Sequence, residues 1–399
     1  SSKQTHMKYI SEFRDKRVAT ALATALATES DPARDYSLME FCGGHTHAIF
    51  RYGIQDLLPP NVHLVHGPGC PVCVLPIGRL DMAIELAENP NVILCSYGDM
   101  LRVPGSRKRS FLKSRAQGRD VRMVYSCAEA IRVAQDNPDK EVVFFAIGFE
   151  TTTPPTAVAI QQADRLGLKN FSVFCNHVLT PSAIQNILDS PDVRKLGTVR
   201  VDGFIGPSHV STIIGSRPYD FFAEEYQRPV VIAGFEPLDV LQSIGMLVRQ
   251  LNEGRAEVEN QFSRGGTPQG NLKAQAMVAE VFELRRSFEW RGLGVVPYSG
   301  LRIKKRYALF DAELRFSLAQ KTVHENKACE CGAILRGVKK PTDCRIFGTV
   351  CTPQNPIGSC MVSSEGACAA YYKYRRHGAT VDDTPVAEKT PESDVAVGE

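Results

Sequence analysis

Residues 142–150 read Val142-Val-Phe-Phe-Ala-Ile-Gly-Phe-Glu150, and this stretch sets the pattern for much of the chain. An apolar run without polar alternation is typical of a strand buried on both faces of a parallel sheet. The run ends in a glycine turn that carries an acid. Because open α/β sheets bind ligands at the carboxyl ends of their strands, such a turn is also a candidate site.

Similar apolar runs recur between residues 38 and about 250, and helical patterns separate them. The predicted strands are Leu38–Cys42, Val62–His66, Val92–Tyr97, Val121–Tyr125, Val142–Ile147, Phe171–Cys175, Gly203–Ile205 and Val230–Ala233. The predicted helices include Gly78–Glu88, Ala128–Gln135, Thr156–Leu166 and Ser182–Asp189. This alternation predicts an α/β fold with doubly wound parallel sheets. Eight strands fit two modest sheets better than one, so we expect two Rossmann-like domains facing a cleft.

The composition along the chain predicts five segments. They are an N-terminal helical segment (1–37), a first α/β domain (38–120), a second α/β domain (121–254), a C-terminal, mainly helical or irregular domain (255–376) and an acidic tail (377–399). The stretch 18–27 is interpreted as an amphipathic helix rather than a secretory signal, because acids interrupt the basic residues before it. Six acids and no aromatic residue predict disorder for the tail.

The charge and the cysteine content narrow the range of possible functions. The chain has 399 residues, with 47 Lys or Arg against 44 Asp or Glu, which gives a net charge of +3. Because the positive and negative charges nearly balance, the sequence predicts no attraction to nucleic acid or to an anionic membrane. No apolar run approaches the ~18 residues that a membrane-spanning helix needs. Without an export signal, the 12 cysteines indicate metal binding or thiol chemistry in the cytoplasm rather than a secreted disulfide framework.

The motif Cys42-Gly-Gly-His-Thr-His47 places three soft or borderline metal ligands within six residues. A thiol on a glycine turn before a helix is expected to be exposed, with its pKa lowered by the helix N-terminus. The imidazoles of His45 and His47 are candidate bases or further ligands. The alternative is a tight turn that carries surface histidines.

Two further groups of cysteines lie downstream. In Gly67-Pro-Gly-Cys-Pro-Val-Cys73, the spacing suits a redox disulfide or half a zinc site, and the lack of a matching second pair nearby favours redox or metal-delivery chemistry. The C-terminal group consists of Cys329, Cys331, Cys344, Cys351, Cys360 and Cys368. Four of these thiolates can bind zinc or an iron–sulfur cluster, and their irregular gaps favour [4Fe–4S]. The remaining two can pass electrons to a disulfide.

Several single residues have two interpretations. Glu150 and Glu236 follow apolar strands and are candidate half-buried acids for proton transfer, or simply helix caps or ion-pair partners. His177 and His209 are either site residues or core histidines. The stretch 102–122 holds eight Lys or Arg and one Asp, which fits an acidic partner or a solvated face.

Together, four motifs resemble those of the HypD family of hydrogenase maturation factors. They are Cys42-Gly-Gly-His-Thr-His47, Gly67-Pro-Gly-Cys-Pro-Val-Cys73, Gly148-Phe-Glu-Thr-Thr152 and Met361-Val-Ser-Ser-Glu-Gly-Ala-Cys368. The resemblance extends over nearly the whole chain. It implies a scaffold on which the Fe(CN)2(CO) unit of [NiFe]-hydrogenase is assembled, in complex with a HypC-type chaperone. It also implies that HypE, acting with HypF, donates the cyanide.

The resemblance carries roles onto individual residues. It implies that Cys42 binds iron with His45 close by, that Cys70 and Cys73 form the essential dithiol, and that Glu150 belongs to the catalytic motifs. It places a [4Fe–4S] cluster in the C-terminal domain. The implied ligands are Cys331, Cys344, Cys351 and Cys368, with Cys329 and Cys360 as an auxiliary redox pair. Cys329 and Cys331 can exchange these roles.

Two other functions remain open at this point. A cluster-dependent thiol–disulfide oxidoreductase of the ferredoxin–thioredoxin reductase type needs a dithiol and a cluster, but no lone thiolate at Cys42. A zinc-stabilised binding module needs neither electrons nor a dithiol, and it predicts no visible absorption from a thiolate–iron chromophore.

Overall fold

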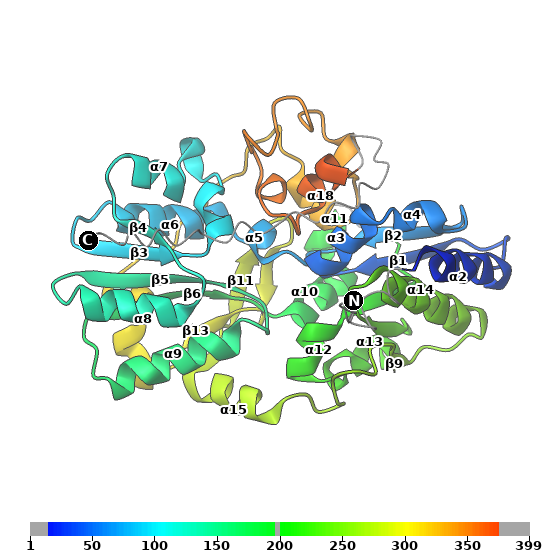
Figure 1. Ribbon diagram of the computed structural model, residues 1–399, viewed down its shortest axis with the longest axis horizontal. Helices are drawn as coiled ribbons and strands as arrows, with labels where there is room; N and C mark the ends of the chain where they lie inside the picture. Colours follow the sequence, from blue (N-terminus) through cyan, green and yellow to red (C-terminus); the bar gives the residue numbers. More distant parts are fainter. Residues whose placement is uncertain (1–14, 196–199, 375–399) are drawn as a thin grey trace, which may run out of the picture.

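Two parallel β-sheets lie side by side along the long axis of the molecule. The Cys-rich segment, which runs from Cys329 to Cys368, packs against the middle of the molecule (Figure 1). The structure is a computed structural model that describes residues 15–195 and 200–374. The first sheet has the strand order β2-β1-β7-β8-β9, and the second has the order β4-β3-β5-β6. All of these neighbours pair in parallel, which confirms the α/β class with two parallel sheets.

Each predicted strand has a counterpart within a few residues. The first sheet contains β1 (Tyr36–Glu40), β2 (Val62–His66), β7 (Gly203–Pro207), β8 (Val230–Ala233) and β9 (Val258–Asn260). The second contains β3 (Val92–Ser96), β4 (Val121–Met123), β5 (Glu141–Gly148) and β6 (Phe171–His177). Strand β5 is buried along almost its whole length, as its unbroken apolar run predicts.

The sheets do not follow the predicted division between 38–120 and 121–254. Strands β1 and β2 pair with β7 to β9, whereas β3 pairs with β4 and β5. The chain therefore crosses from the first sheet to the second after β2 and returns after β6. A local apolar pattern identifies a strand, but it carries no information about which distant strand will be its neighbour.

Helices cover the faces of both sheets. The α-helices are α2 (Lys16–Glu29), α3 (Gly43–Arg51), α4 (Ile54–Leu57), α5 (Pro71–Val74), α6 (Ile77–Ala87), α7 (Phe111–Ala116), α8 (Cys127–Asp136), α9 (Thr153–Arg165), α10 (Thr180–Asp189), α11 (Pro191–Lys195), α12 (Ser208–Ile214), α13 (Asp220–Glu224), α14 (Pro237–Asn252), α15 (Leu272–Val281), α16 (Ala312–Arg315), α17 (Cys331–Leu335) and α18 (Ala367–Tyr374). The 3-10 helices are η1 (Gly98–Arg102), η2 (Ser106–Lys108), η3 (Arg217–Tyr219), η4 (Lys305–Phe310), η5 (Pro341–Asp343) and η6 (Ser359–Met361).

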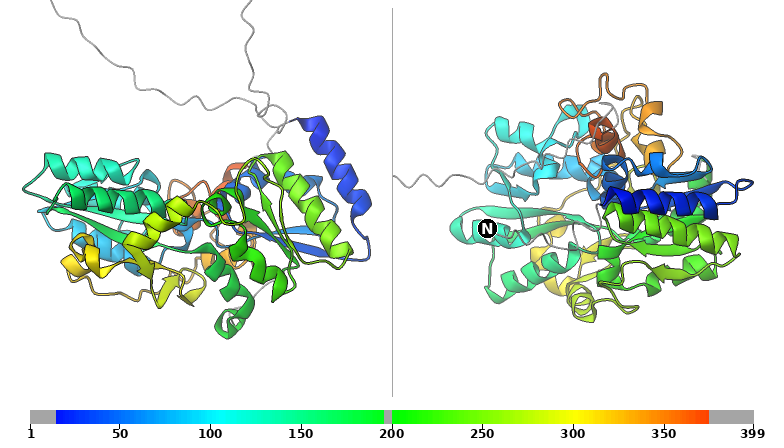
Figure 2. Two further views of the ribbon diagram at one scale, coloured as in Figure 1. Left: turned by 90° about the horizontal axis from the view of Figure 1, so that it is seen from below. Right: turned by 45° about the vertical axis from the view of Figure 1, so that its right-hand side comes forward.

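The helix expected at residues 18–27 is present as α2, which packs alongside α14 (Figure 2). Glu29 at its end pairs with Arg249 of α14 at 2.7 Å. The Tyr36 hydroxyl donates a hydrogen bond to Asn252 Oδ1 at the end of the same helix. These contacts hold α2 to the first sheet. The tail 377–399 lies outside the described residues.

The region 255–376 contains more β-structure than the sequence suggests. Strand β9 completes the first sheet, and β10 (Phe282–Leu284), β11 (Ser287–Trp290), β12 (Gly294–Pro297) and β13 (Leu301–Ile303) form two antiparallel pairs, β10 with β13 and β11 with β12. The prediction of mainly helical or irregular structure therefore missed these short strands, although α15 in the same region is helical. These strands are short and broken by glycine, so they lack the apolar runs that marked the others.

A buried ion pair joins the C-terminal region to the second sheet. Arg79 of α6 is almost fully buried and pairs with Glu313 of α16 at 2.5 Å, while its Nε donates to Asn176 on β6 at 2.7 Å. Its guanidinium also lies over the Phe174 ring, 4.4 Å from the centroid. Among the described residues, every helix is too short or too polar to span a membrane.

Candidate metal and thiol site

Cys42 lies in the turn between β1 and α3, where it is the N-cap residue of α3. Glu40, the last residue of β1, is wholly buried and holds this turn: its carboxylate accepts hydrogen bonds from the Cys42 backbone N–H at 3.0 Å and from the Thr46 hydroxyl. The Glu40 carboxylate also pairs with His66 at the end of β2. The turn thus depends on two neighbouring parallel strands.

The expectation of an exposed thiol with a low pKa is wrong for Cys42. Its relative exposure is only 9%. Burial raises the pKa of the thiol above its usual value of 9.0, and the negative charges of Glu365 and Glu40 raise it further. Hydrogen bonds from the Gly44 and His45 backbone lower the pKa, but their effect is smaller. Two carboxylates in a desolvated site therefore outweigh the helix N-terminus.

His209, at the start of α12, is the side chain that contacts the Cys42 sulfur. Its Nε2 lies 3.8 Å from Cys42 Sγ. Its ring stacks on Phe235 at 4.0 Å, and Phe235 stacks in turn on His45 at 4.4 Å. Desolvation, and then the nearby His45 ring, lower the pKa of His209 to about 4. The imidazole is therefore neutral at pH 7, which is the form that binds metals.

His45 faces the backbone rather than Cys42. Its Nε2 lies 3.0 Å from the Gly234 carbonyl oxygen and 3.2 Å from that of Ala233, so this nitrogen carries the proton and donates it. The residue is fully buried, and its Nδ1 has no hydrogen-bond partner. Burial lowers the pKa of His45. Of its two ring nitrogens, only Nδ1 has a lone pair free for a ligand.

Cys70 and Cys73 form a disulfide in the turn after β2, and both are buried. Cys70 caps α5, because its sulfur accepts a hydrogen bond from the Cys73 backbone N–H at 3.2 Å. This turn touches the Cys42 turn directly: the Gly43 N–H donates to the Gly69 carbonyl at 3.0 Å. A Cβ on Gly69 would lie 2.3 Å from the Cys42 backbone nitrogen, so only glycine permits this approach.

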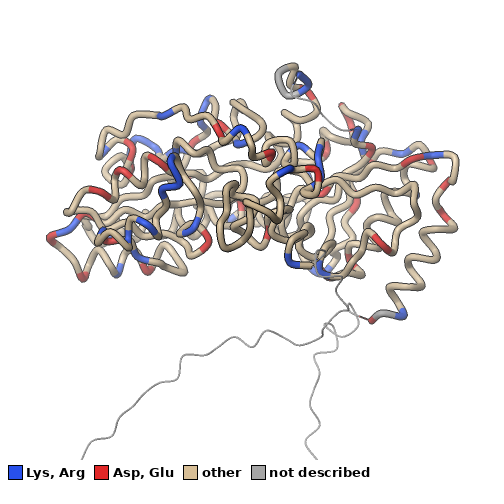
Figure 3. The backbone as a smooth tube through the Cα atoms, turned by 90° about the horizontal axis from the view of Figure 1, so that it is seen from above, with Lys and Arg blue, Asp and Glu red and all other residues tan. Residues whose placement is uncertain are grey.

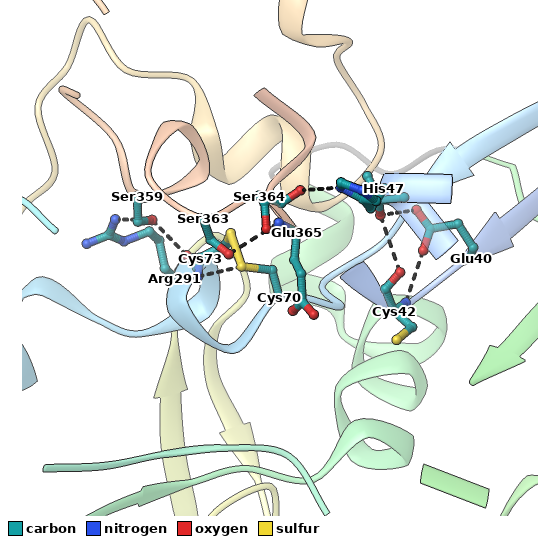
Figure 4. The surroundings of a disulfide bond; sticks show 11 residues. Glu40, Cys42, His47, Cys70, Cys73, Arg291, Ser359, Ser363, Ser364 and Glu365 are labelled. Carbon is teal, nitrogen blue, oxygen red and sulfur yellow. Dashed lines mark hydrogen bonds between the residues drawn. A yellow bond between two sulfur atoms is a disulfide. The ribbon is translucent and has the colours of Figure 1, made fainter. Parts of the chain in front are cut away.

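The helix that carries the disulfide also packs against the segments that carry two of the C-terminal cysteines. Helix α5 packs on η6, which contains Cys360, and on α17, which begins at Cys331. The Ser359 hydroxyl donates to the Cys73 carbonyl at 3.1 Å and accepts from the buried Arg291 side chain. The two redox motifs of the sequence are therefore neighbours in space, although they lie far apart along the chain (Figure 4).

Glu365 lies between the two cysteine turns, where Figure 4 shows it between Cys70 and Cys42. It belongs to the segment before α18 and packs so closely that a Cβ on Gly43 would lie 2.3 Å from its own Cβ. Desolvation, and then the charge of Asp99, raise the pKa of Glu365. A carboxyl whose pKa is raised towards neutrality can donate and accept protons beside the sulfurs.

The six C-terminal cysteines gather in one neighbourhood. Cys331 makes side-chain hydrogen bonds with Cys329, whose sulfur lies at 3.2 Å, and with Cys360. Cys368 interacts electrostatically with four others, namely Cys329, Cys331, Cys344 and Cys351. A Cβ on Gly358 would lie 2.4 Å from the Cys331 sulfur and 2.5 Å from that of Cys329. Glycine at this position leaves room for the sulfurs.

The described residues contain no preformed cage. Within 15–195 and 200–374, no group of three or more His, Cys, Asp or Glu side chains is arranged as a metal site. The donors that gather at the C-terminal group are nevertheless thiols only, which is the ligand chemistry of iron–sulfur clusters and structural zinc. The donor type fits an iron–sulfur cluster.

Glu150 lies at the end of the second sheet and is buried. The Thr180 backbone N–H and hydroxyl donate to its two carboxylate oxygens at 2.7 and 2.8 Å. Burial raises the pKa of Glu150 to about 7, although these bonds oppose the rise. The buried Tyr219 ring lies within electrostatic range of both Glu150 and Cys42.

Two other acid and histidine candidates have structural roles. The His177 ring bonds to the Thr156 hydroxyl at 2.9 Å and to the Gly148 carbonyl at 3.3 Å, as a core histidine does. Glu236 forms a capping box with Asp239 at the start of α14. For these residues the simpler interpretation is correct.

Residues 17–375 match the model of a known protein family, HypD, described as "Hydrogenase formation hypA family". The chain belongs to the HypD family of hydrogenase maturation factors. It is 67% identical over 370 residues to HypD2 of Bradyrhizobium diazoefficiens, which covers 93% of this chain and 97% of that relative. It is 68% identical over 375 residues to HypD of Azotobacter vinelandii, which covers 94% and 99%. Against HypD of Escherichia coli the identity is 45% over 375 residues, which covers 93% and 99%.

Three residues of the site in this HypD family member, His209, Glu365 and Arg291, could not be assigned a role from the sequence. His209 was one of two histidines with an open interpretation, and its position after a strand was the available signal. Glu365 stood inside a quoted motif without a role. Arg291, which bonds to Ser359 next to Cys360, follows a short strand and carries no motif. Only the folded chain brings these three residues to the cysteines.

Proposed function

We propose that this HypD family member is a scaffold and redox assembly factor for the Fe(CN)2(CO) centre of [NiFe]-hydrogenase. The observation that carries the proposal is that three cysteine-bearing segments adjoin one another. The Cys42 turn and the Cys70–Cys73 turn share a backbone hydrogen bond, and Ser359, next to Cys360, bonds to the Cys73 carbonyl. An oxidoreductase of the ferredoxin–thioredoxin reductase type would need only the Cys70–Cys73 turn and the C-terminal cysteines. The lone thiol next to a neutral imidazole favours the scaffold.

In this proposal, iron is the cargo. The Cys42 thiolate binds it together with a thiolate from a HypC-type chaperone, because low-spin iron with cyanide and carbonyl prefers soft donors. The thiol has a raised pKa and must lose its proton as iron binds. His209, whose Nε2 lies 3.8 Å from the sulfur and whose ring is neutral, is positioned to bind the iron as a second ligand. His45 packs behind this site through Phe235.

Cyanide transfer then needs electrons and protons. We propose that HypE, acting with HypF, presents the cyanide as a thiocyanate. Its release as cyanide consumes two electrons, which the Cys70 and Cys73 thiols supply as they form a disulfide. Glu365 and Glu150, both acids with raised pKa values, are the candidate proton donors and acceptors around the sulfurs.

The C-terminal cysteines are proposed to hold a [4Fe–4S] cluster, which supplies single electrons when bound. Two ligand sets are open, because Cys329 and Cys331 can exchange roles. Since Cys331 rather than Cys329 hydrogen-bonds to Cys360, the contacts favour Cys331 and Cys360 as the auxiliary pair. Cys329 then joins Cys344, Cys351 and Cys368 as a ligand. Visible absorption at roughly 400 nm should then be lost in Cys329→Ala and retained in Cys331→Ala.

Infrared spectroscopy of the anaerobically purified protein with its co-purifying partners tests the scaffold. We expect iron-bound cyanide and carbonyl bands in the wild type and their loss in Cys42→Ala, with the Cys70–Cys73 redox titration unchanged. Cys127→Ala is the matched control, because that free thiol is also buried but lies at the start of α8, beside the second sheet. Bands that persist in Cys42→Ala would leave the oxidoreductase as the better function.

A further inference from the structure

A group of basic side chains lies against the Cys-rich segment, although the whole chain has a net charge of only +3. Both signs of charge alternate over most of the backbone (Figure 3). We define the basic surface as Arg102, Arg107 and Lys108, all exposed, in the connection from η1 to η2. Lys113 and Arg115 on α7, which packs against η1, add two further exposed positive charges.

The basic surface carries uncompensated charge. In the part of the chain that the structure describes, no acidic side chain within 4.0 Å pairs with Arg102, Arg107 or Lys108. The nearby acids already have other partners. Glu88 pairs with Arg109 and Arg119, and Glu325 pairs with the buried Arg291 at 3.0 Å. Asp99 interacts with Glu365 on the side of the thiol site.

This surface touches the backbone that holds the C-terminal cysteines. The Arg102 guanidinium donates to the Pro353 carbonyl at 3.1 Å. A cavity of about 300 Å³ lies between the residues of η2 and the segments around Asn326 and Ile357. The carbonyl of Asn326 accepts the Cys329 N–H at 2.9 Å, and the Ile357 N–H donates to the Cys351 sulfur at 3.4 Å. One hydrogen bond therefore connects each of these two segments of the cavity wall to a cysteine.

The backbone holds two of these charges in an unusual conformation. Arg107 and Lys108 have φ angles of 55° and 58°, in the left-handed region that favours glycine. Such strain persists only where the surrounding structure imposes it. Asp81 helps to impose it, because its carboxylate accepts the Ser106 N–H at 2.9 Å. Two consecutive strained residues thus display cationic side chains beside the cysteines.

We propose that the basic surface docks a small acidic electron-transfer protein. The inference rests on the proposed function, in which each cyanide release leaves Cys70 and Cys73 as a disulfide. Two molecules of a reduced one-electron donor supply two electrons, and two protons from solvent complete the conversion of the S–S bond into two thiols. Electron-transfer complexes are weak and charge-steered, so exposed, unpaired cations are the appropriate recognition elements.

The test uses the full-length protein and, as the probe, a reduced plant-type [2Fe–2S] ferredoxin, which is a small acidic donor. The variant is Arg107→Glu with Lys108→Glu. The control, Lys273→Glu with Lys305→Glu, makes the same change in net charge at exposed lysines on α15 and η4. Helix α15 lies on the opposite side of the molecule from the Cys-rich segment (Figure 1). Calorimetric titration at low and high salt measures Kd, and stopped-flow measures ferredoxin oxidation.

We expect roughly tenfold weaker binding for the basic-surface variant, because it replaces two attractive charges by repulsive ones. The control should bind as the wild type does, and raising the salt should weaken the wild type towards the variant. Equal losses in both variants would show a response to net charge alone and overturn the proposal. So would unchanged binding in a variant whose thermal unfolding matches that of the wild type.

A neutral pair, Arg107→Gln with Lys108→Gln, guards against folding effects, and it should show a smaller loss in the same direction. With dithionite in place of ferredoxin, the basic-surface variant should still yield the iron–cyanide bands. Absence of those bands from the wild type would count against the proposed function, whereas the titration tests the docking surface independently. A variant that loses the bands with dithionite as well would contradict a role limited to docking.

Discussion

Replacing Glu150 with Gln should change how the stability of this protein depends on pH. Burial raises the pKa of this carboxyl from 4.5 to about 7 in the folded state. A raised folded-state pKa means that the contribution to stability is fully present below pH 4.5 and is lost as the pH rises through 7. The difference corresponds to about 3 kcal/mol, at 1.36 kcal/mol per pKa unit. Glutamine keeps the shape and both contacts with Thr180, but it cannot ionise.

Denaturant unfolding at pH 5 and at pH 8 measures this effect. Between these values, the free energy of unfolding of Glu150→Gln should rise relative to that of the wild type by about 2–3 kcal/mol. Glu257→Gln, a change at an exposed carboxylate, should show no such rise. If the difference between Glu150→Gln and the wild type is the same at both pH values, Glu150 does not titrate as its burial implies.

Two other substitutions test the packing around the site. Arg79→Ala should lower the free energy of unfolding by about 2–3 kcal/mol, because it removes the charged hydrogen bonds of a buried guanidinium to Asn176 and to the half-buried Glu313; a loss below about 1 kcal/mol in denaturant titrations would contradict this. Gly358→Ala should strongly reduce iron–sulfur absorption after reconstitution, since its Cβ would lie 2.5 Å from the sulfur of Cys329, the proposed cluster ligand. Gly245→Ala, with open space around its Cβ, is the control, and full absorption in both variants would refute the close approach.

Much of the fold could be predicted because strands buried on both faces of a parallel sheet consist of continuous apolar residues, which are recognisable in the sequence. Strands β2 and β8 begin and end at the predicted residues. The short, polar β9 was missed, since Val258-Glu-Asn260 has no apolar run and is held only by pairing with β8. Sheet membership was also beyond reach, because the choice of a neighbouring strand depends on the crossovers and not on local pattern.

The candidate site, too, could be predicted only in part. Its cysteines could be found from motif and spacing alone, since thiol chemistry depends on residue type. The environment of Cys42 could not be predicted, because the groups that bury this thiol and raise its pKa come from distant segments of the chain. His209 follows β7 and Glu365 precedes α18, and neither position reveals that its side chain will lie beside the thiol. Local helix-terminus reasoning gave the wrong direction for the Cys42 pKa for that reason.

The double crossing of the chain between the two sheets has a consequence for synthesis on the ribosome. A nascent chain that ends at residue 200 still lacks β7, β8 and β9, three of the five strands of the first sheet. Strand β1 must therefore wait for β7 while the second sheet forms ahead of it. The Cys-rich segment, Cys329 to Cys368, is made after all the strands of both sheets, so the frame that positions the cysteines is complete before they emerge.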